Sequence, residues 1–251
     1  MIHAASLLHD DVIDGAETRR GSPSSNVEYG NKMSILAGDF MLGRASVALA
    51  RLRNSEVVEL MATVIANLVE GEFMQLKNTA TDETKAATAE TFDYYLEKTY
   101  LKTASLIAKS CRSAAVLGGA EENVVEAAYE YGRNLGLAFQ LLDDMLDYTV
   151  SAADLGKPAG ADLKLGLATA PALFAWQRYP ELGPMIKRKF SQPGDPERAR
   201  ELVEQSDGVQ QTEQLALEYS TKARDALAVL PESDAKAALV ELTATMQNRK
   251  K

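Results

Sequence analysis

Two acidic clusters of the same pattern lie inside otherwise apolar segments, and they limit the folds that this chain can adopt. One spans residues 10–14 (DDVID) and the other residues 143–147 (DDMLD). On a helix, the first and last aspartates of each cluster lie on one face, about one turn apart. Carboxylates this close repel one another and are costly beside an apolar core unless cations neutralise them. Magnesium suits such oxygen ligands and bridges carboxylates to phosphate groups.

The rest of the chain has a helical period that glycine and proline interrupt. The pattern predicts loops over 15–26 and 151–162 and helices over 1–17, 30–51, 54–78, 89–117, 121–150, 165–177, 180–190, 196–205, 208–229 and 233–248. No segment shows strand alternation bounded by hairpin turns. Helices that are apolar almost all round, such as 34–49 and 135–142, are typical of the centre of a large bundle. We therefore expect one all-α domain, a large helical bundle over residues 1–251.

Composition narrows the possible partners. The formal net charge is −9, which argues against nucleic acid as the main partner, because phosphate backbones attract basic surfaces. Cys111 is the single cysteine, so no intrachain disulfide is possible. The sequence contains no run of about 18 apolar residues, so we expect no transmembrane helix. The first residues already read as the middle of a buried helix, so we expect the chain to lack helices upstream of it.

Basic residues follow each acidic cluster. Arg19 and Arg20 come after the first, and Lys157 after the second. Guanidinium groups beside a metal–carboxylate cluster suit diphosphate oxygens. Taken singly, each feature has a plainer interpretation: a solvated acidic face, ordinary loop charge or, for Lys102 in a long amphipathic helix, a surface lysine. We interpret His9 as a packing residue rather than an acid–base catalyst.

Together these segments resemble the trans-polyprenyl diphosphate synthases. The resemblance covers nearly the whole chain. It runs from LLHDDVIDGAETRRG through AGDFMLGRA, EGEFMQL, YLEKTYLKTASLIAKSC, YGRNLGLAFQLLDDMLDY and GKPAGADLKLGLATAPALFAW to SDGVQQTEQLA. The later segments are most similar to the long-chain mitochondrial branch, which makes the ubiquinone side chain. The resemblance implies a helical bundle of the isoprenoid synthase type with a central active-site cavity. Family members normally carry an isopentenyl-diphosphate-binding loop upstream of the first acidic helix, and this sequence begins after that region.

The resemblance also implies roles for individual residues in condensing isopentenyl diphosphate with an allylic diphosphate. Asp10 and Asp14 would bind two Mg²⁺ ions and Asp143 a third. The weaker or water-mediated ligands would be Asp11, Asp144 and Asp147. Groups that bind the allylic diphosphate would be Arg19, Lys102 and Lys157, while Arg20 would reach isopentenyl diphosphate. Thr103 and Gln140, which we count with Lys102 as catalytic, would stabilise the allylic cation.

Product length would depend on the residues four and five positions before the first acidic cluster. These are Ser6 and Ala5, whose small side chains predict a deep tunnel and a long product, unless they are small only for close helix packing. The alternatives are a short-chain geranylgeranyl diphosphate synthase and a non-catalytic subunit of a heteromeric synthase. A class I terpene cyclase is disfavoured because the second acidic motif is intact. By resemblance we expect a homodimer or heteromer in mitochondria.

Overall fold

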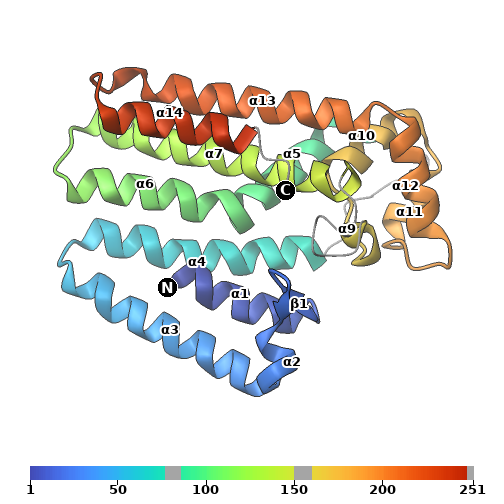
Figure 1. Cartoon of the computed structure of the whole chain (residues 1–251), viewed down its shortest axis with the longest axis horizontal. Helices are drawn as coiled ribbons and strands as arrows, with labels where there is room; N and C mark the ends of the chain where they lie inside the picture. The colour runs from blue at the N-terminus through green and yellow to red at the C-terminus, as the bar shows by residue number, and fades with distance from the viewer. Residues whose placement is uncertain (77–85, 150–159, 248–251) are drawn as a thin grey trace. The chain divides into compact units, whose positions relative to one another are not determined.

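The computed structural model describes residues 1–76, 86–149 and 160–247 (Figure 1). They belong to two compact units, Met1–Ile65 and Ala66–Lys251, which are described separately. Helices make up nearly all of the regular structure in both units, so the all-α prediction is confirmed. Organisation as one domain stays a prediction.

The first unit consists of α1 (Ile2–Ile13), α2 (Ser25–Tyr29), α3 (Asn31–Arg51) and the start of α4 (Ser55–Leu76). Helix α1 packs along α3. It ends four residues before the predicted boundary, because Gly15 has a φ of 63°, a left-handed conformation that ends helices. A small hairpin follows, with strand β1 (Thr18–Arg19) antiparallel to β2 (Ser22–Pro23). The sequence did not predict this hairpin, because two residues per strand are too few to show alternation.

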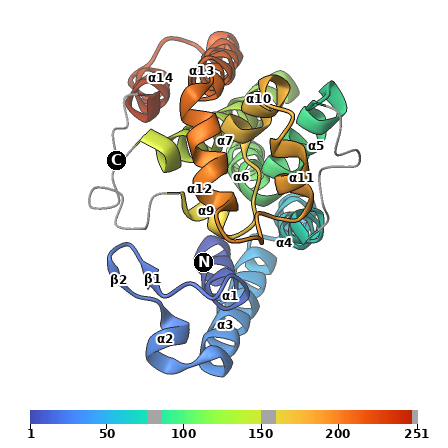
Figure 2. The same ribbon diagram turned by 90° about the vertical axis from the view of Figure 1, so that its right-hand side faces the viewer.

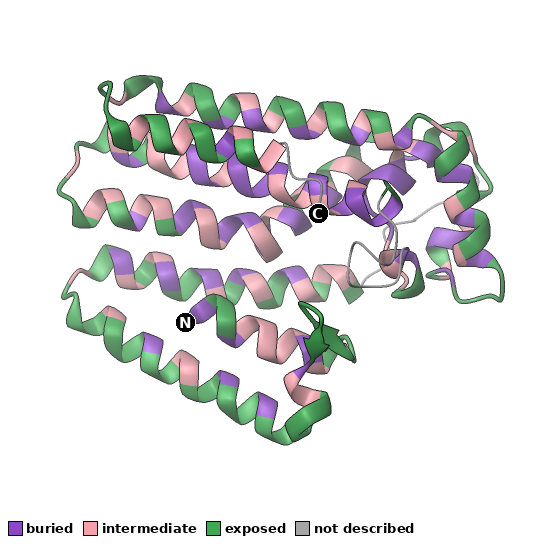
Figure 3. Ribbon diagram, viewed as in Figure 1, coloured by how far each residue is buried: buried purple, intermediate pink, exposed green. Residues whose placement is uncertain are grey.

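The second unit contains the remaining helices. They are the end of α4, α5 (Ala89–Thr99), the π-helical turn η1 (Tyr100–Ala104), α6 (Ser105–Leu117), α7 (Glu122–Thr149), α9 (Ala161–Lys164), α10 (Ala170–Arg178), α11 (Leu182–Lys187), α12 (Asp195–Gln205), α13 (Gly208–Ala226), the 3₁₀ turn η2 (Leu227–Val229) and α14 (Asp234–Gln247). Helix α7 contacts both α6 and α13, and Figure 2 shows it between them. Its C-terminal half is buried around most of its circumference (Figure 3), as its apolar sequence predicted.

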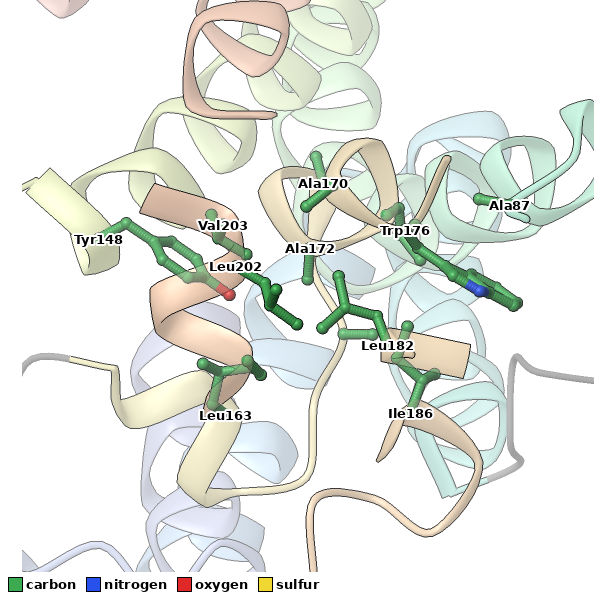
Figure 4. Packing of buried hydrophobic residues seen from close by; sticks show 14 of the residues in the cluster. Ala87, Tyr148, Leu163, Ala170, Ala172, Trp176, Leu182, Ile186, Leu202 and Val203 are labelled. Carbon is green, nitrogen blue, oxygen red and sulfur yellow. The ribbon is translucent and has the colours of Figure 1, made fainter. Parts of the chain in front are cut away.

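An apolar core at one end of the second unit supports the C-terminal half of α7. Leu173 and Trp176 of α10, Leu182 of α11 and Leu202 of α12 are all at most 2% exposed. Figure 4 shows these helices converging, with Tyr148 of α7 in the same cluster. Burying apolar surface of this kind contributes roughly 25 cal/mol per Å². The second acidic motif, which precedes Tyr148, is therefore held on a firmly packed helix.

Two glycines of α7 allow it to approach the neighbouring helix closely. A Cβ at Gly136 would lie 2.6 Å from Ala104 Cα, and one at Gly132 would lie 2.8 Å from Ala108 Cα. Their contact surface includes η1, the π-helical turn that joins α5 to α6. Single π turns inside α-helices are frequent at functional sites. The sequence predicted one continuous helix over 89–117, and the π turn interrupts it at Lys102 and Thr103.

Helix α3 is the one element of the described chain that is long and apolar enough, by length and composition alone, to cross a membrane. The sequence predicted no transmembrane segment. A single helix of this kind is weak evidence for a membrane span, and α3 also carries the charged residues Asp39 and Arg44.

Candidate active site

The first acidic motif occupies the last turn of α1. Asp10 is half-buried, and Asp14 is exposed at the end of the helix, where its backbone N–H donates to the carbonyl of Asp10 at 2.8 Å. Asp11 is 3% exposed and accepts a hydrogen bond from Arg19 Nε at 3.0 Å. A second nitrogen of Arg19 also contacts Asp11. Asp11 therefore pairs with a protein cation, whereas Asp10 and Asp14 are more accessible.

The β1–β2 hairpin carries the two adjacent arginines. Arg20 lies at its turn with a φ of 53°, next to Gly21 with a φ of 78°. Both arginine residues are exposed, although Arg19 donates hydrogen bonds to Asp11. The hairpin thus places the Arg19 guanidinium beside the first acidic motif and the Arg20 backbone at its turn.

His9 fixes α1 against α3. Its Nε2 atom lies 3.1 Å from the carbonyl oxygen of Ile35, and a Cβ at Gly38 would be only 2.2 Å from that nitrogen. The ring therefore occupies space that only glycine leaves open. This contact agrees with the packing interpretation of His9.

The two residues proposed to set product length lie one turn earlier on α1. Ala5 is completely buried, and Ser6 is half-buried with its hydroxyl donating to the His3 carbonyl at 2.9 Å. Both side chains are small, as the tunnel prediction requires. Their role in chain length stays a prediction.

In the second unit, the end of α4 positions Lys102. The Lys102 Nζ atom lies 2.5 Å from Glu72 Oε1 and donates to Gln75 Oε1 at 2.8 Å. A Cβ at Gly71 would be 2.5 Å from Lys102 Cγ, so glycine makes room for the lysine stem. The Lys102 side chain is 21% exposed. Contacts with Glu72 and Gln75 therefore fix the position of the Lys102 ammonium group, unlike that of a freely solvated surface lysine.

Thr103 and Gln140 contact each other where η1 packs against α7, whereas their role in stabilising a cation stays a prediction. The Thr103 hydroxyl donates to Gln140 Oε1 at 3.0 Å, and Gln140 Nε2 donates to Asp144 Oδ1 at 2.8 Å. The other oxygen of Asp144 accepts from the Tyr95 hydroxyl at 2.6 Å. The pair proposed to stabilise a cation is therefore connected to the second acidic motif.

The three carboxylates of the second motif have different surroundings. Asp143 is half-buried. Asp144 is 3% exposed, and Asp147 is completely buried. Asp147 accepts from the backbone N–H groups of Ala161 and Asp162 at 3.3 and 3.2 Å, so it holds the first turn of α9. Lys157, the predicted diphosphate ligand, lies outside the described residues.

Burial changes the proton affinity of this cluster. It raises the pKa of Asp144 to about 6, against the opposing effect of hydrogen bonds from Tyr95 and Gln140. Burial also lowers the pKa of Lys98, whose ammonium group lies 5.6 Å from the centre of the Tyr95 ring. Perturbed groups of this kind cluster at functional sites more often than elsewhere.

The described residues contain no group of three or more acidic, histidine or cysteine side chains close enough to form a complete metal cage. Magnesium does not require one, because it keeps several waters and uses one or two carboxylates together with substrate phosphates. Asp10 and Asp14, one helical turn apart, and the half-buried Asp143 fit that mode of binding.

Sequence reasoning missed the supporting residues. Glu72 and Gln75 lie in the EGEFMQL segment, and their spacing of three on one helix face was an available signal. Tyr95 gave no signal, because its partner is 49 positions away in the sequence.

Comparison with known proteins identifies the family of this chain. Residues 1–205 match the polyprenyl synthetase family. The whole chain is 66% identical to a probable mitochondrial hexaprenyl pyrophosphate synthase of Yarrowia lipolytica, of which it covers 56%. It is 60% identical to decaprenyl-diphosphate synthase subunit 1 of Schizosaccharomyces pombe, of which it covers 66%. The chain thus spans little more than half to about two thirds of the length of these relatives.

Among solved structures, a polyprenyl synthase from Caulobacter crescentus, in complex with calcium and isoprenyl diphosphate, matches with a TM-score of 0.87 and 38% identity. The match covers 100% of this chain and 76% of that one. The fold is therefore the all-α isoprenoid synthase fold. With the family match extending over both acidic motifs, the chain belongs to the polyprenyl synthetase family.

Proposed function

We propose that this protein is a magnesium-dependent prenyltransferase. It condenses isopentenyl diphosphate with an allylic diphosphate to make a long-chain all-trans polyprenyl diphosphate, used for the ubiquinone side chain. The observation that carries the proposal is the arrangement at η1 and α7, where Thr103 and Gln140 are hydrogen-bonded to each other and to Asp144 of the second acidic motif. Lys102, the neighbour of Thr103 in η1, is held by Glu72 and Gln75 of α4. An ammonium group can stabilise the charge on a departing diphosphate, and hydroxyl and amide oxygens can stabilise a developing allylic cation.

Each group has a chemical task in this reaction. Magnesium, when bound, neutralises the charge that grows on the departing pyrophosphate. Asp10, Asp14 and Asp143 would hold three ions in total, and Asp11, Asp144 and Asp147 act less directly. Arg19, Lys102 and Lys157 bind the allylic diphosphate, and Arg20 binds isopentenyl diphosphate.

The carbon chemistry then proceeds without a protein nucleophile. The allylic C–O bond breaks, and its electrons leave with pyrophosphate. The hydroxyl of Thr103 and Oε1 of Gln140 present oxygen lone pairs to the allylic cation. The double bond of isopentenyl diphosphate attacks that cation, and loss of a proton to the released pyrophosphate restores an alkene.

The closely related proteins support a long product and a mitochondrial location, because the Yarrowia lipolytica protein is a probable mitochondrial hexaprenyl pyrophosphate synthase. The small side chains of Ala5 and Ser6 fit a deep tunnel. We expect Ala5→Phe protein to make shorter prenyl chains than wild type. Chains of unchanged length would refute the tunnel assignment and leave close helix packing as the reason for small residues.

We also propose that the protein works as a homodimer or heteromer. Helix α3 exposes a stripe of apolar side chains at helical spacing: Met33 (59%), Leu36 (53%), Phe40 (69%) and Val47 (45%). Exposed apolar stripes of this kind mark association surfaces. The Schizosaccharomyces pombe relative is subunit 1 of a decaprenyl-diphosphate synthase, which is consistent with assembly from subunits.

The test is a radiolabelled condensation assay with isopentenyl diphosphate, farnesyl diphosphate and Mg²⁺, followed by sizing of the extracted prenols. It is run on the chain alone, on a chimera extended with the segments of the Yarrowia lipolytica relative that lie outside the aligned region, and with a candidate partner subunit. Products longer than geranylgeranyl, abolished by EDTA and by Asp10→Ala, support the proposal. A geranylgeranyl product identifies a short-chain synthase, and inactivity under all three conditions favours a non-catalytic subunit.

A further inference from the structure

Tyr95 lies at the start of a hydrogen-bond chain that ends at the proposed catalytic residues. It is on α5, 1% exposed, and its hydroxyl donates to Asp144 Oδ2 at 2.6 Å. The chain continues through Gln140 on α7 to Thr103 on η1. Because α5 runs directly into η1, the two ends of this chain join the same helical segment to α7 at two points.

The donor and acceptor types give the chain a direction. An ionised carboxylate only accepts hydrogen bonds, so Asp144 requires the NH₂ group of Gln140 to face it. The amide oxygen of Gln140 must then point to the other side, where the Thr103 hydroxyl donates to it. The orientation of the Gln140 amide, and with it the position of a partial negative charge beside Thr103, is thereby fixed by Asp144.

Tyr95 in turn fixes Asp144. Its hydroxyl occupies one carboxylate oxygen while Gln140 occupies the other, and the carboxylate is almost completely removed from solvent. A buried carboxylate held by two donors is restricted in rotation, because losing either bond leaves it unsatisfied.

We propose that Tyr95 is a positioning residue of the prenyl transfer reaction, which acts through Asp144 to orient the Gln140 amide towards the reacting carbon. The catalytic consequence rests on the proposed synthase activity, whereas the orientation of Gln140 can be measured without it. In this arrangement Asp144 acts as the hydrogen-bond centre of the chain, and direct binding of magnesium falls to Asp143.

Tyr95→Phe removes only the hydroxyl and is the decisive variant. Its matched control is Tyr131→Phe, since Tyr131 is 2% exposed and its hydroxyl donates to the Leu239 carbonyl at 3.0 Å, in contact with α14 rather than with Gln140. Loss of a buried hydrogen bond to a charged group predicts a fall in kcat of about tenfold for Tyr95→Phe. KM for both diphosphates and the half-saturating Mg²⁺ concentration should stay within about twofold of wild type, as expected when only transition-state stabilisation is lost.

A wild-type kcat in Tyr95→Phe, or an equal loss in Tyr131→Phe, overturns the proposal. A second comparison, between Asp144→Asn and Asp143→Asn, tests which aspartate binds magnesium. The half-saturating Mg²⁺ concentration should rise in Asp143→Asn and remain near wild type in Asp144→Asn. An equal rise in both variants would make Asp144 a metal ligand and overturn its role as the hydrogen-bond centre.

A second readout does not depend on activity. In protein with ¹⁵N-labelled glutamine, the side-chain amide signal of Gln140, assigned with Gln140→Glu, should shift in Tyr95→Phe and stay in place in Tyr131→Phe. An unmoved Gln140 signal in Tyr95→Phe overturns the inference. If wild-type protein forms no prenyl product but the signal moves as expected, the proposed function fails while the positioning of Gln140 by Tyr95 stands.

Discussion

Gly136→Ala tests whether the close approach of α7 to the π turn is necessary for the site. The added Cβ would lie 2.6 Å from Ala104 Cα and 2.7 Å from Ala104 Cβ, where ordinary contact begins at 3.4 Å. The helices would have to separate by roughly 0.8 Å, since packed interiors leave little free space. Overpacking of this kind costs about 1–3 kcal/mol, while Gly→Ala in a helix gains about 1 kcal/mol. We expect a net loss of about 1 kcal/mol in the free energy of unfolding.

The same displacement should impair activity more than stability. Thr103 Oγ1 and Gln140 Oε1 are 3.0 Å apart, and separating their helices by most of an ångström breaks that hydrogen bond. Misplacement on this scale predicts a fall in kcat of roughly 10- to 100-fold.

Gly43→Ala is the control for helix propensity, because Gly43 lies inside α3 and a Cβ there meets nothing within 4 Å. Since Gly43 lies between Phe40 and Val47 on the proposed association stripe, both variants are compared at one protein concentration with the same oligomeric state. It should raise the free energy of unfolding by up to about 1 kcal/mol through helix propensity alone. Urea unfolding followed by circular dichroism measures both variants, and the condensation assay measures kcat. Stabilisation of Gly136→Ala to the same extent as Gly43→Ala, with normal kcat, would refute the argument that this contact is tight.

Two further predictions concern charge. Asp195→Asn should lower the free energy of unfolding by about 2 kcal/mol, because Asp195 is 5% exposed and accepts two bonds from Arg188, each at 2.7 Å. Glu181→Gln should lower the free energy of unfolding much less, because its ion pair with Arg198 is exposed to water. Urea unfolding measures both variants. Burial raises the pKa of Asp144 to about 6 in the folded protein, against about 4 in the unfolded chain. The folded state therefore holds the proton more tightly, and this contribution to stability is complete below pH 4 and is lost as the pH rises through 6. In EDTA, the free energy of unfolding of wild type should fall by about 3 kcal/mol relative to that of Asp144→Asn between pH 4 and 7. A difference between the two proteins that does not change with pH would contradict this prediction.

The sequence predicted the helices well where local signals determine them. Periodic apolar positions and glycine or proline at the boundaries located α3, α4, α7 and α13 to within a few residues. The π turn at η1 gave no such signal. It coincides with a contact in which Gly132 and Gly136 bring α7 against Ala104 and Ala108, and contacts between distant segments are not visible in a local period.

The acidic motifs were also visible in the sequence, but the hydrogen-bond partners of their aspartates were not. Spacing alone shows that the first and last aspartates of each copy share a helix face while the middle one is rotated by about 100°. In the structure both middle aspartates are 3% exposed and bonded to protein donors, Asp11 to Arg19 and Asp144 to Tyr95 and Gln140. Those donors come from other segments, so the motif itself could not reveal them.

The last aspartates of the two motifs differ in how accessible they are to a metal ion. Helix α1 ends at Ile13, which leaves Asp14 exposed at its terminus, whereas α7 continues to Thr149 and buries Asp147 under the first turn of α9. If buried carboxylates that already accept protein hydrogen bonds are poor metal ligands, the first motif offers two accessible carboxylates and the second offers one, Asp143. The proposed allocation of two ions to the first motif and one to the second would then follow from where the two helices end, because both motifs carry aspartates at the same three positions.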